Sequence, residues 1–378
     1  MARIDAFFRL MNAQGASDLH LSCGNLPALR IRGDLERINY RVLEDAELTE
    51  LLYEIAPDEK RKVFEEQGDL DFAYELPGVG RFRANYFRQA SGVAAVFRQI
   101  PTEILTIEQL GLPQVVRRFA TLEKGLVLVT GPTGSGKSTT LAAIVDYANK
   151  HRRDHIVTIE DPIEFQHRSR NCIINHREMG RDTKSFAAAL RGALREDPDI
   201  ILVGELRDLE TISLAIEAAA TGHLVLATLH TQSASKTVDR MIEVFPSEQQ
   251  DSVRSLLADS LKGIMAQTLF RRADNKGRVA AIEILVCTPA VASLIREGKT
   301  YQLPTQMQTG RKYGMVYFDD AVEELIQRRQ ITPEEGFESA VEKERFVRYL
   351  RKVPDEYQEL LALRTQEGAA RGAAPARR

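Results

Sequence analysis

One eight-residue segment constrains the fold more than any other part of the chain. Residues 131–138 read Gly-Pro-Thr-Gly-Ser-Gly-Lys-Ser and fit the pattern G-x-x-x-x-G-K-[ST]. The apolar run at 126–130 predicts a strand buried on both faces, and residues 139–149 predict a helix. Strand, glycine-rich loop and helix in this order predict a phosphate-binding loop, because main-chain N–H groups at a helix N-terminus then face phosphate oxygens.

The pattern after this loop predicts a doubly wound α/β sheet. Further buried strands are expected at 155–159, 200–203 and 224–228, and helices are expected between them, one near 186–195. Alternating buried strands and helices are typical of a mostly parallel sheet. Beyond Pro246 the chain is predicted to be mostly helical. We therefore expect a P-loop domain over 125–364 and a disordered Ala/Gly/Arg-rich tail over 365–378.

The first hundred residues predict a separate, small α+β domain. Helices are expected at 4–12 and 47–66, and strands at 18–22 and 28–32. Three more strands, at 69–74, 80–87 and 93–98, are expected to form a meander. Residues 101–124 carry Gly111 and Pro113 and are predicted to be the hinge between the two domains.

Composition narrows the function classes. The formal net charge of the 378 residues is −3, which gives no global attraction to nucleic acid. No apolar run reaches the length of a membrane span, and the N-terminus has no secretory signal pattern. The three cysteines, Cys23, Cys172 and Cys287, lie far apart without metal-ligand spacing. We therefore expect a cytoplasmic protein that neither inserts into membranes nor binds nucleic acid.

The loop residues and two acidic clusters are the candidate site. Lys137 is expected to reach the β- and γ-phosphates of a nucleotide, and Ser138 to ligate Mg²⁺. One acidic cluster, 160–164, and the acid Glu205 each follow a predicted strand, where ligands bind in open α/β sheets. Asp199 precedes its strand and is therefore expected at the wrong edge for a metal.

Histidines and arginines are weaker candidates for contacts to the nucleotide. His230 closes a predicted strand and could sense the γ-phosphate, whereas His223 opens that strand and fits a structural role better. One arginine set could face a nucleotide held by another subunit or form an exposed basic sheet face that binds nucleic acid, and a second set could instead lie at a subunit boundary. Spacing does not choose between the two sets, which are Arg81, Arg83, Arg88 and Arg98, and Arg177, Arg181, Arg191 and Arg195.

Four sequence boxes, in order, resemble the secretion-superfamily ATPases of type IV pili and type II secretion. They are the loop at 131–138, an acidic box at 158–165, a strand ending in an acid at 197–205, and a histidine box at 221–231. The resemblance extends over nearly the whole chain, to about residue 340. Within the family the chain resembles the pilus retraction motors, because it lacks a long extra N-terminal domain and a paired CxxC motif. Residues 289–299 also resemble the C-terminal motif of those motors, with Ala292 and Ser293 departing from it.

The resemblance implies a fold, an activity and residue roles. The fold is a PAS-like N-terminal domain followed by a RecA-like P-loop domain, in a homo-hexameric ring that hydrolyses ATP to ADP and powers pilus retraction. Glu164 would be the catalytic base, Glu205 would support Mg²⁺ with Ser138, and Lys137 would act on the phosphates. The nucleotide contacts would be Gly131, Pro132, Thr133, Gly134, Ser135, Gly136, Lys137, Ser138, Thr139, His230, Arg81 and Arg98.

The implied partners are an inner-membrane pilus platform protein and a paralogous pilus ATPase, which places the protein at the cytoplasmic side of the pilus base. An accessory retraction ATPase, and a secretion or DNA-transfer motor of the same superfamily, share these boxes. A nucleotide-gated scaffold without turnover is the alternative that is not an enzyme.

Overall fold

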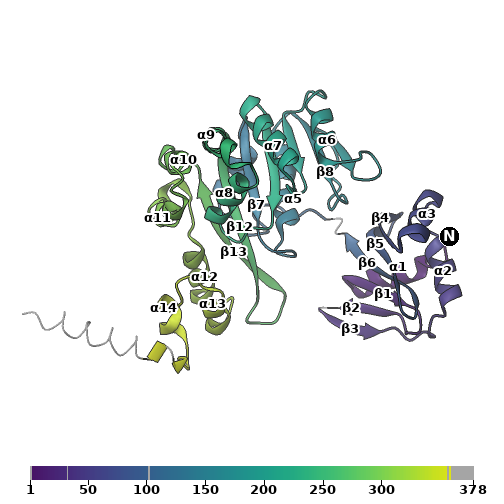
Figure 1. The fold of residues 1–378 in the computed structure, drawn as a ribbon. Helices are drawn as coiled ribbons and strands as arrows, with labels where there is room; N and C mark the ends of the chain where they lie inside the picture. The colour runs from purple at the N-terminus through teal and green to yellow at the C-terminus, as the bar shows by residue number, and fades with distance from the viewer. Residues whose placement is uncertain (1, 32, 101–102, 356, 359–378) are drawn as a thin grey trace, which may run out of the picture. The chain divides into compact units, whose positions relative to one another are not determined.

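The computed structural model describes residues 2–31, 33–100, 103–355 and 357–358 (Figure 1). The chain forms two compact units. The first contains the residues up to Leu126 together with Ser138–Ala227, and the second contains Val127–Lys137 and the residues from Thr228 onward.

The N-terminal part of the first unit is built on a six-stranded antiparallel sheet. The strand order is β3-β2-β1-β6-β5-β4. Its elements are α1 (Asp5–Gln14), β1 (Asp18–Ser22), β2 (Ala28–Ile31), β3 (Asp34–Arg37), α2 (Asp45–Tyr53), α3 (Asp58–Gln67), β4 (Asp69–Leu76), β5 (Gly80–Gln89) and β6 (Gly92–Ile100). The α+β fold predicted for the first hundred residues and the β4–β6 meander are confirmed.

Two details of this region differ from prediction. The single helix expected at 47–66 is two helices, α2 and α3, with Pro57 directly before the second. Proline lacks a main-chain donor and clashes with the preceding turn, so a helix running through it breaks there. The edge strand β3 is the other difference, because all four of its residues are exposed and no alternation marks it.

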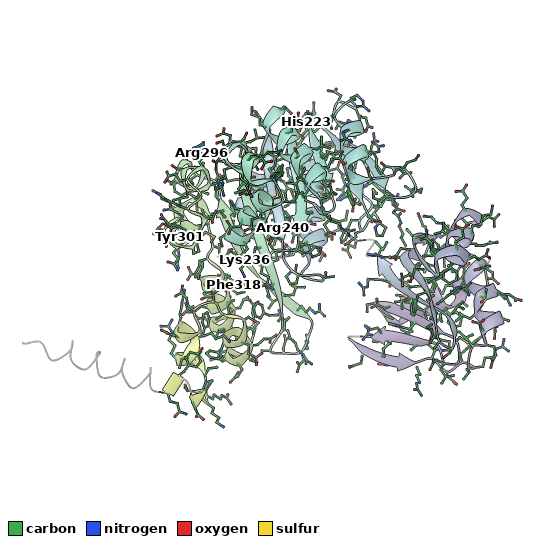
Figure 2. The ribbon with its side chains drawn as sticks, viewed as in Figure 1. His223, Lys236, Arg240, Arg296, Tyr301 and Phe318 are labelled. Carbon is green, nitrogen blue, oxygen red and sulfur yellow. The ribbon has the colours of Figure 1, made fainter. Side chains whose placement is uncertain are left out.

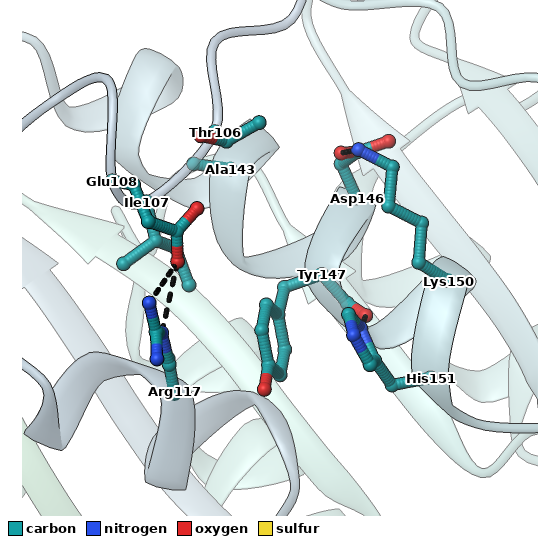
Figure 3. Close-up of a pocket in the computed structure, with 9 residues that line it drawn as sticks. All are labelled: Thr106, Ile107, Glu108, Arg117, Ala143, Asp146, Tyr147, Lys150 and His151. Atoms are coloured by element: carbon teal, nitrogen blue, oxygen red, sulfur yellow. Dashed lines mark hydrogen bonds and ion pairs between the residues drawn. The ribbon is translucent and has the colours of Figure 1, made fainter.

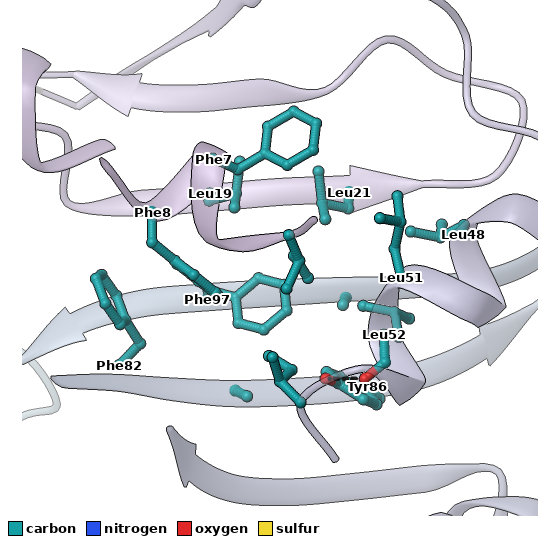
Figure 4. Close-up of a cluster of buried hydrophobic side chains, with 14 of the residues drawn as sticks. Phe7, Phe8, Leu19, Leu21, Leu48, Leu51, Leu52, Phe82, Tyr86 and Phe97 are labelled. Carbon is teal, nitrogen blue, oxygen red and sulfur yellow. Dashed lines mark hydrogen bonds between the residues drawn. The ribbon is translucent and has the colours of Figure 1, made fainter. Parts of the chain in front are cut away.

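Aromatic side chains fill the core of this sheet (Figure 4). The Phe8 ring from α1 stacks on Phe82 of β5 with centroids 4.4 Å apart, and its edge meets Phe97 of β6 at 5.0 Å. Tyr86 is fully buried, and its hydroxyl donates to the main-chain oxygen of Leu52 at 2.9 Å. Burial of these rings therefore fastens α1 and α2 to the same face of the sheet.

A second, seven-stranded sheet has the order β13-β12-β7-β11-β10-β8-β9. The strands are β7 (Gly125–Thr130), β8 (His155–Glu160), β9 (Ile173–Glu178), β10 (Ile200–Val203), β11 (Leu224–Leu229), β12 (Leu261–Arg271) and β13 (Arg278–Val286). β8, β9, β10 and β11 are parallel to their neighbours within that group. The predicted doubly wound α/β sheet is confirmed. The strand order reverses at β8, since β9 lies on one side of it and β10 on the other.

The three helices predicted between the strands are confirmed as α5 (Lys137–His151), α6 (Phe186–Ala193) and α7 (Leu209–Thr221). The other helices of this part of the chain are α4 (Val115–Ala120), which precedes β7, and α8 (Ala234–Glu243) and α9 (Gln250–Ser260), which follow β11. Side-chain oxygens of Ser185, Asp208 and Ser233 cap the N-termini of α6, α7 and α8. Such caps satisfy donors that a helix start otherwise leaves unpaired.

The prediction that the chain beyond Pro246 is mostly helical is wrong over 261–286. β12 and β13 form a long antiparallel hairpin there. The apolar run at 264–266 and the one at 279–286 fit a buried strand or a buried helix equally well by periodicity. Helices follow the hairpin, namely α10 (Pro289–Arg296), α11 (Leu303–Thr309), α12 (Phe318–Gln327), α13 (Pro333–Ser339) and α14 (Lys343–Phe346), with short 3₁₀ turns at Ser247–Gln249, Thr300–Gln302, Arg311–Tyr313 and Val347–Tyr349.

The predicted connector, 101–124, contains the helix α4. Val116 and Phe119 of α4 are buried, and the Arg152 guanidinium donates to the main-chain oxygen of Leu122. The domain boundaries and the hinge stay predictions, and the tail at 365–378 lies outside the described residues. Among the residues that the structure describes, no helix is long and apolar enough to cross a membrane.

Candidate functional site

The glycine-rich loop lies between β7 and α5, as predicted. Gly131, Gly134 and Gly136 have positive φ angles of 139°, 78° and 89°. A Cβ atom on Gly131 would lie 2.3 Å from the main-chain oxygen of Gln267 and 2.6 Å from Ser135 Oγ. Only glycine fits this crowded, left-handed position. The chain therefore turns tightly from the strand into the helix.

The interior of this loop fits a phosphate group. Lys137 Nζ donates to the main-chain oxygens of Gly131 at 2.9 Å and Pro132 at 3.2 Å. Ser135 Oγ is buried and has no hydrogen-bond partner among the described residues. A buried polar atom without a partner is costly unless a ligand or water satisfies it. A cation and an unsatisfied hydroxyl thus lie within one glycine-rich turn at a helix start, where anions bind.

The residues after β11 are fixed to the strand that leads into the loop. Ser233 caps α8, and Thr237 Oγ1 donates to the main-chain oxygen of Ser233 at 2.7 Å. The same hydroxyl lies 2.7 Å from Thr231 Oγ1 and 3.5 Å from Thr130 Oγ1, at the end of β7. His230 directly precedes this network and is exposed.

The acidic box begins within β8 and continues past its end, at the point where the strand order reverses. Glu160 ends β8, and its Oε2 accepts a hydrogen bond from the main-chain N–H of Glu164 at 3.2 Å. The Glu160 side chain is 12% exposed, and burial raises its pKa to about 7. The negative charge of Glu164 also raises this pKa, whereas Arg81 lowers it. Glu164 itself is exposed, so its carboxylate can meet solvent.

Glu205 and Asp199 lie at opposite ends of β10. Glu205 follows the strand through Gly204, and its carboxylate forms an ion pair with Arg207 at 2.8 Å. Asp199 precedes the strand and accepts a hydrogen bond from the first N–H of β8, on His155, at 2.9 Å. The carboxyl ends of β8 and β10 therefore carry Glu160 and Glu205, and Asp199 lies at the other edge, as expected.

The two arginines singled out for nucleotide contact are both ion-paired. Arg81 of β5 pairs with Glu178, and both side chains are largely buried. Arg98 of β6 donates to Asp18 Oδ1 at 2.8 Å and is mostly exposed. His223, labelled in Figure 2, has Nδ1 3.0 Å from the main-chain oxygen of Ala218, which fits the structural role expected for it.

Sequence reasoning missed a buried polar cluster on β9. His176 Nδ1 lies 2.8 Å from Thr158 Oγ1, and the His167 ring stacks on His176 with centroids 5.9 Å apart. Burial lowers the pKa of His167 to about 4 and also lowers that of His176. The spacing of His176 and Glu178, two residues apart, is a signal that would have placed both on one face of a strand.

Figure 3 shows a separate cavity of about 290 Å³ in the first unit. Its lining combines two ion pairs, Glu108 with Arg117 and Asp146 with Lys150, and a stacked pair, Tyr147 with His151, with centroids 4.1 Å apart. It lies between the segment before α4 and the second half of α5. It contains none of the predicted site residues.

Comparisons with known proteins agree with the fold. The family model described as Type II/IV secretion system protein matches residues 3–349. The type IV pilus retraction ATPase PilT of Pseudomonas aeruginosa is 54% identical over 333 residues, which are 88% of this chain and 96% of PilT. The type IV pilus ATPase PilU of the same organism is 40% identical over 336 residues, 89% of this chain and 88% of PilU.

A solved structure supports the same assignment. The crystal structure of the pilus retraction motor PilT with bound ADP superposes with a TM-score of 0.84 at 43% identity, covering 91% of this chain and 98% of that chain. This match confirms the predicted architecture of an N-terminal domain followed by a RecA-like domain. The chain therefore belongs to the type II/IV secretion system protein family.

Proposed function

We propose that this protein is an ATP-hydrolysing motor subunit that powers retraction of type IV pili. The observation that carries the proposal is a phosphate-binding loop with a buried, unsatisfied Ser135 hydroxyl, in a chain that matches a retraction ATPase over 96% of that enzyme's length. An ATPase needs a phosphate site, a metal holder and a group that orients water. The chain offers residues for each.

The loop residues 131–139 hold the nucleotide. Lys137 is already directed into the loop by two main-chain oxygens, and phosphate oxygens can replace these as its acceptors. Bound Mg²⁺ would neutralise charge on the phosphates, and Ser138 and Glu205 are the residues that would hold it. The hydroxyl and the carboxylate are both oxygen ligands, which Mg²⁺ prefers.

Glu164 is the general base. Its main chain is held by Glu160, while its carboxylate is exposed and follows a parallel strand at the reversal of strand order. A carboxylate in such a place can accept a proton from water as the water attacks. His230, Arg81 and Arg98 complete the nucleotide contacts, and the two arginines must leave the ion pairs described above to do so.

The working assembly is a homo-hexameric ring on the cytoplasmic side of the inner membrane. The ring contacts a pilus platform protein in that membrane and works with a paralogous pilus ATPase. Changes in nucleotide state open and close the domains of each subunit, as in hinge-type switches. Similarity to PilT over nearly the full length of both chains supports this assembly.

An accessory retraction role is the second candidate, supported by 40% identity to PilU. The identity of 54% to PilT over a similar length favours the main motor. Deletion of the gene, followed by a count of surface pili and a twitching assay, tests the proposal. We expect the deletion strain to carry excess pili and to lose twitching. The wild-type gene should restore normal piliation and twitching, and the Lys137→Ala gene should not. Cells without pili would mean that the protein drives extension instead.

A further inference from the structure

Two glutamates lie at paired positions at the carboxyl ends of β8 and β9. The parallel register pairs Glu160 with Glu178, so both side chains lie on one face of the sheet. Their side chains are 12% and 8% exposed. Burial of a carboxyl group is costly unless the group is hydrogen-bonded or paired with a cation. This arrangement therefore requires partners for each carboxylate.

The two carboxylates bind neighbouring main-chain N–H groups of the acidic box. Glu178 Oε2 accepts from the N–H of Ile163 at 3.2 Å, and Glu160 Oε2 accepts from the N–H of Glu164, also at 3.2 Å. Ile163 is buried, whereas Glu164 is exposed. The box is thus fixed at two successive residues, and the second of these carries the proposed base.

Arg81 supplies the positive charge for Glu178. The arginine comes from β5 of the N-terminal sheet, and its guanidinium donates to the same Oε2 that accepts from Ile163. The arginine side chain is only 11% exposed. A buried ion pair that loses one partner leaves an uncompensated charge, which is strongly unfavourable. The hydrogen bond from the Ile163 N–H to Glu178 therefore depends on the Arg81 guanidinium staying beside the same carboxylate.

We infer that Glu178 is a positioning residue that couples Arg81 to the main chain beside Glu164. The inference rests on the proposed function, because it assumes that Glu164 is the base. When Arg81 moves towards a nucleotide, Glu178 loses its ion-pair partner, and the N–H of Ile163 loses a firmly held acceptor. A change in the position of Arg81 therefore alters how the main chain beside Glu164, the proposed base, is held.

Steady-state kinetics of two Glu178 variants test the inference. Glu178→Gln keeps an oxygen acceptor for Ile163 but loses the charge that holds Arg81, whereas Glu178→Ala loses both. Displacement of a catalytic group by about 1 Å costs roughly a hundredfold in rate. We expect kcat to fall by about tenfold in Glu178→Gln and about a hundredfold in Glu178→Ala. KM for ATP should not rise, because Glu178 is not itself a nucleotide contact and both variants release Arg81, which is one.

Glu196→Gln is the matched control. Glu196 lies outside the acidic box and forms an ion pair at 2.9 Å with Arg177, a neighbour of Glu178 on β9. Its kcat should equal that of the wild type. Wild-type kcat in both Glu178 variants would overturn the inference. A wild-type protein that hydrolyses no ATP would instead defeat the proposed function.

Melting temperatures separate positioning from folding. Arg81→Gln leaves a buried carboxylate without its cation and should melt well below the wild type. Adding Glu178→Gln removes that carboxylate, so the double variant should melt above Arg81→Gln alone. Strict additivity of the two changes would show that the residues are not coupled, and would overturn the inference.

Discussion

The Lys137 ammonium nitrogen lies 2.9 Å from the main-chain oxygen of Gly131, at the opposite end of the same loop. The lysine therefore closes the loop on itself before any ligand is considered. Its ammonium group already points into the loop. The side chain therefore needs little rearrangement when phosphate oxygens replace the main-chain acceptors.

Replacement of Lys137 by alanine should abolish both nucleotide binding and turnover. The variant loses the one loop side chain that carries a positive charge, and charge-assisted hydrogen bonds to phosphate are among the strong ones. Binding of a fluorescent ADP analogue and release of phosphate measure the two effects. Lys150→Ala is the control, since Lys150 lies in the last turn of the same helix and pairs with Asp146. Wild-type binding by Lys137→Ala would contradict the assignment of the loop.

Replacement of Glu164 by glutamine should separate binding from hydrolysis. The amide cannot accept the proton of an attacking water, and loss of a general base costs about a hundredfold to ten-thousandfold in rate. Binding should persist, because Glu164 makes its contribution during the reaction. Single-turnover hydrolysis and analogue binding report on the two properties. Glu210→Gln, in an exposed pair with Arg191, is the control, and near-normal turnover by Glu164→Gln would rule out its role as the base.

The sequence was sufficient to predict those elements whose signals lie within a few contiguous residues. β7, β10 and β11 are buried at every position, and such continuous apolar runs predict strands within an α/β sheet. The glycine-rich loop is equally local, since strand, loop and helix are contiguous. The helix break at Pro57 was a local signal too, although the periodicity around it obscured the break.

Strands that are defined by pairing with a distant part of the chain could not be predicted from such contiguous signals. β9 reads Ile-Ile-Asn-His-Arg-Glu, and its two apolar residues followed by four polar ones do not alternate as the residues of a half-buried strand would. Glu178 becomes part of the site only through its register with Glu160 and its contact with Arg81, almost a hundred positions earlier. The β12–β13 hairpin likewise depends on pairing between two apolar runs whose periodicity alone fits a helix.

Titration of Glu160 should make stability fall as pH rises between about 4.5 and about 7. Burial raises the pKa of this carboxyl from 4.5 to about 7, so the folded protein keeps a proton that the unfolded chain releases in that range. Proton uptake by the folded state stabilises it at low pH, and the benefit is lost as pH rises through the folded pKa. The expected size is on the order of 3 kcal/mol, since one pKa unit corresponds to about 1.4 kcal/mol.

Denaturant unfolding of the wild type and of Glu160→Gln across this pH range measures the contribution. The difference between the two proteins isolates the contribution of Glu160 from that of other titrating groups, such as His176 beside it. The variant should lose less stability than the wild type between pH 4.5 and 7. Parallel pH profiles for the two proteins would show that Glu160 keeps an ordinary pKa.

The Thr237 hydroxyl should contribute to stability through the contacts that it makes behind the loop. Thr130 and Thr237 are fully buried, and Thr237→Val keeps the shape of the side chain while it removes the hydroxyl. The hydroxyls of Thr231 and Thr130 then lose a partner, and a buried polar group left unpaired costs about 1–3 kcal/mol. Thr237→Ser retains the hydroxyl and loses one methyl group, which costs about 1 kcal/mol.

The midpoint of urea unfolding should therefore be lower for Thr237→Val than for Thr237→Ser. Thr309→Val, at an exposed threonine of α11, is the control and should leave the midpoint unchanged. A valine variant as stable as the serine variant would show that packing alone holds α8 against β7, and that the hydroxyl network adds nothing to it.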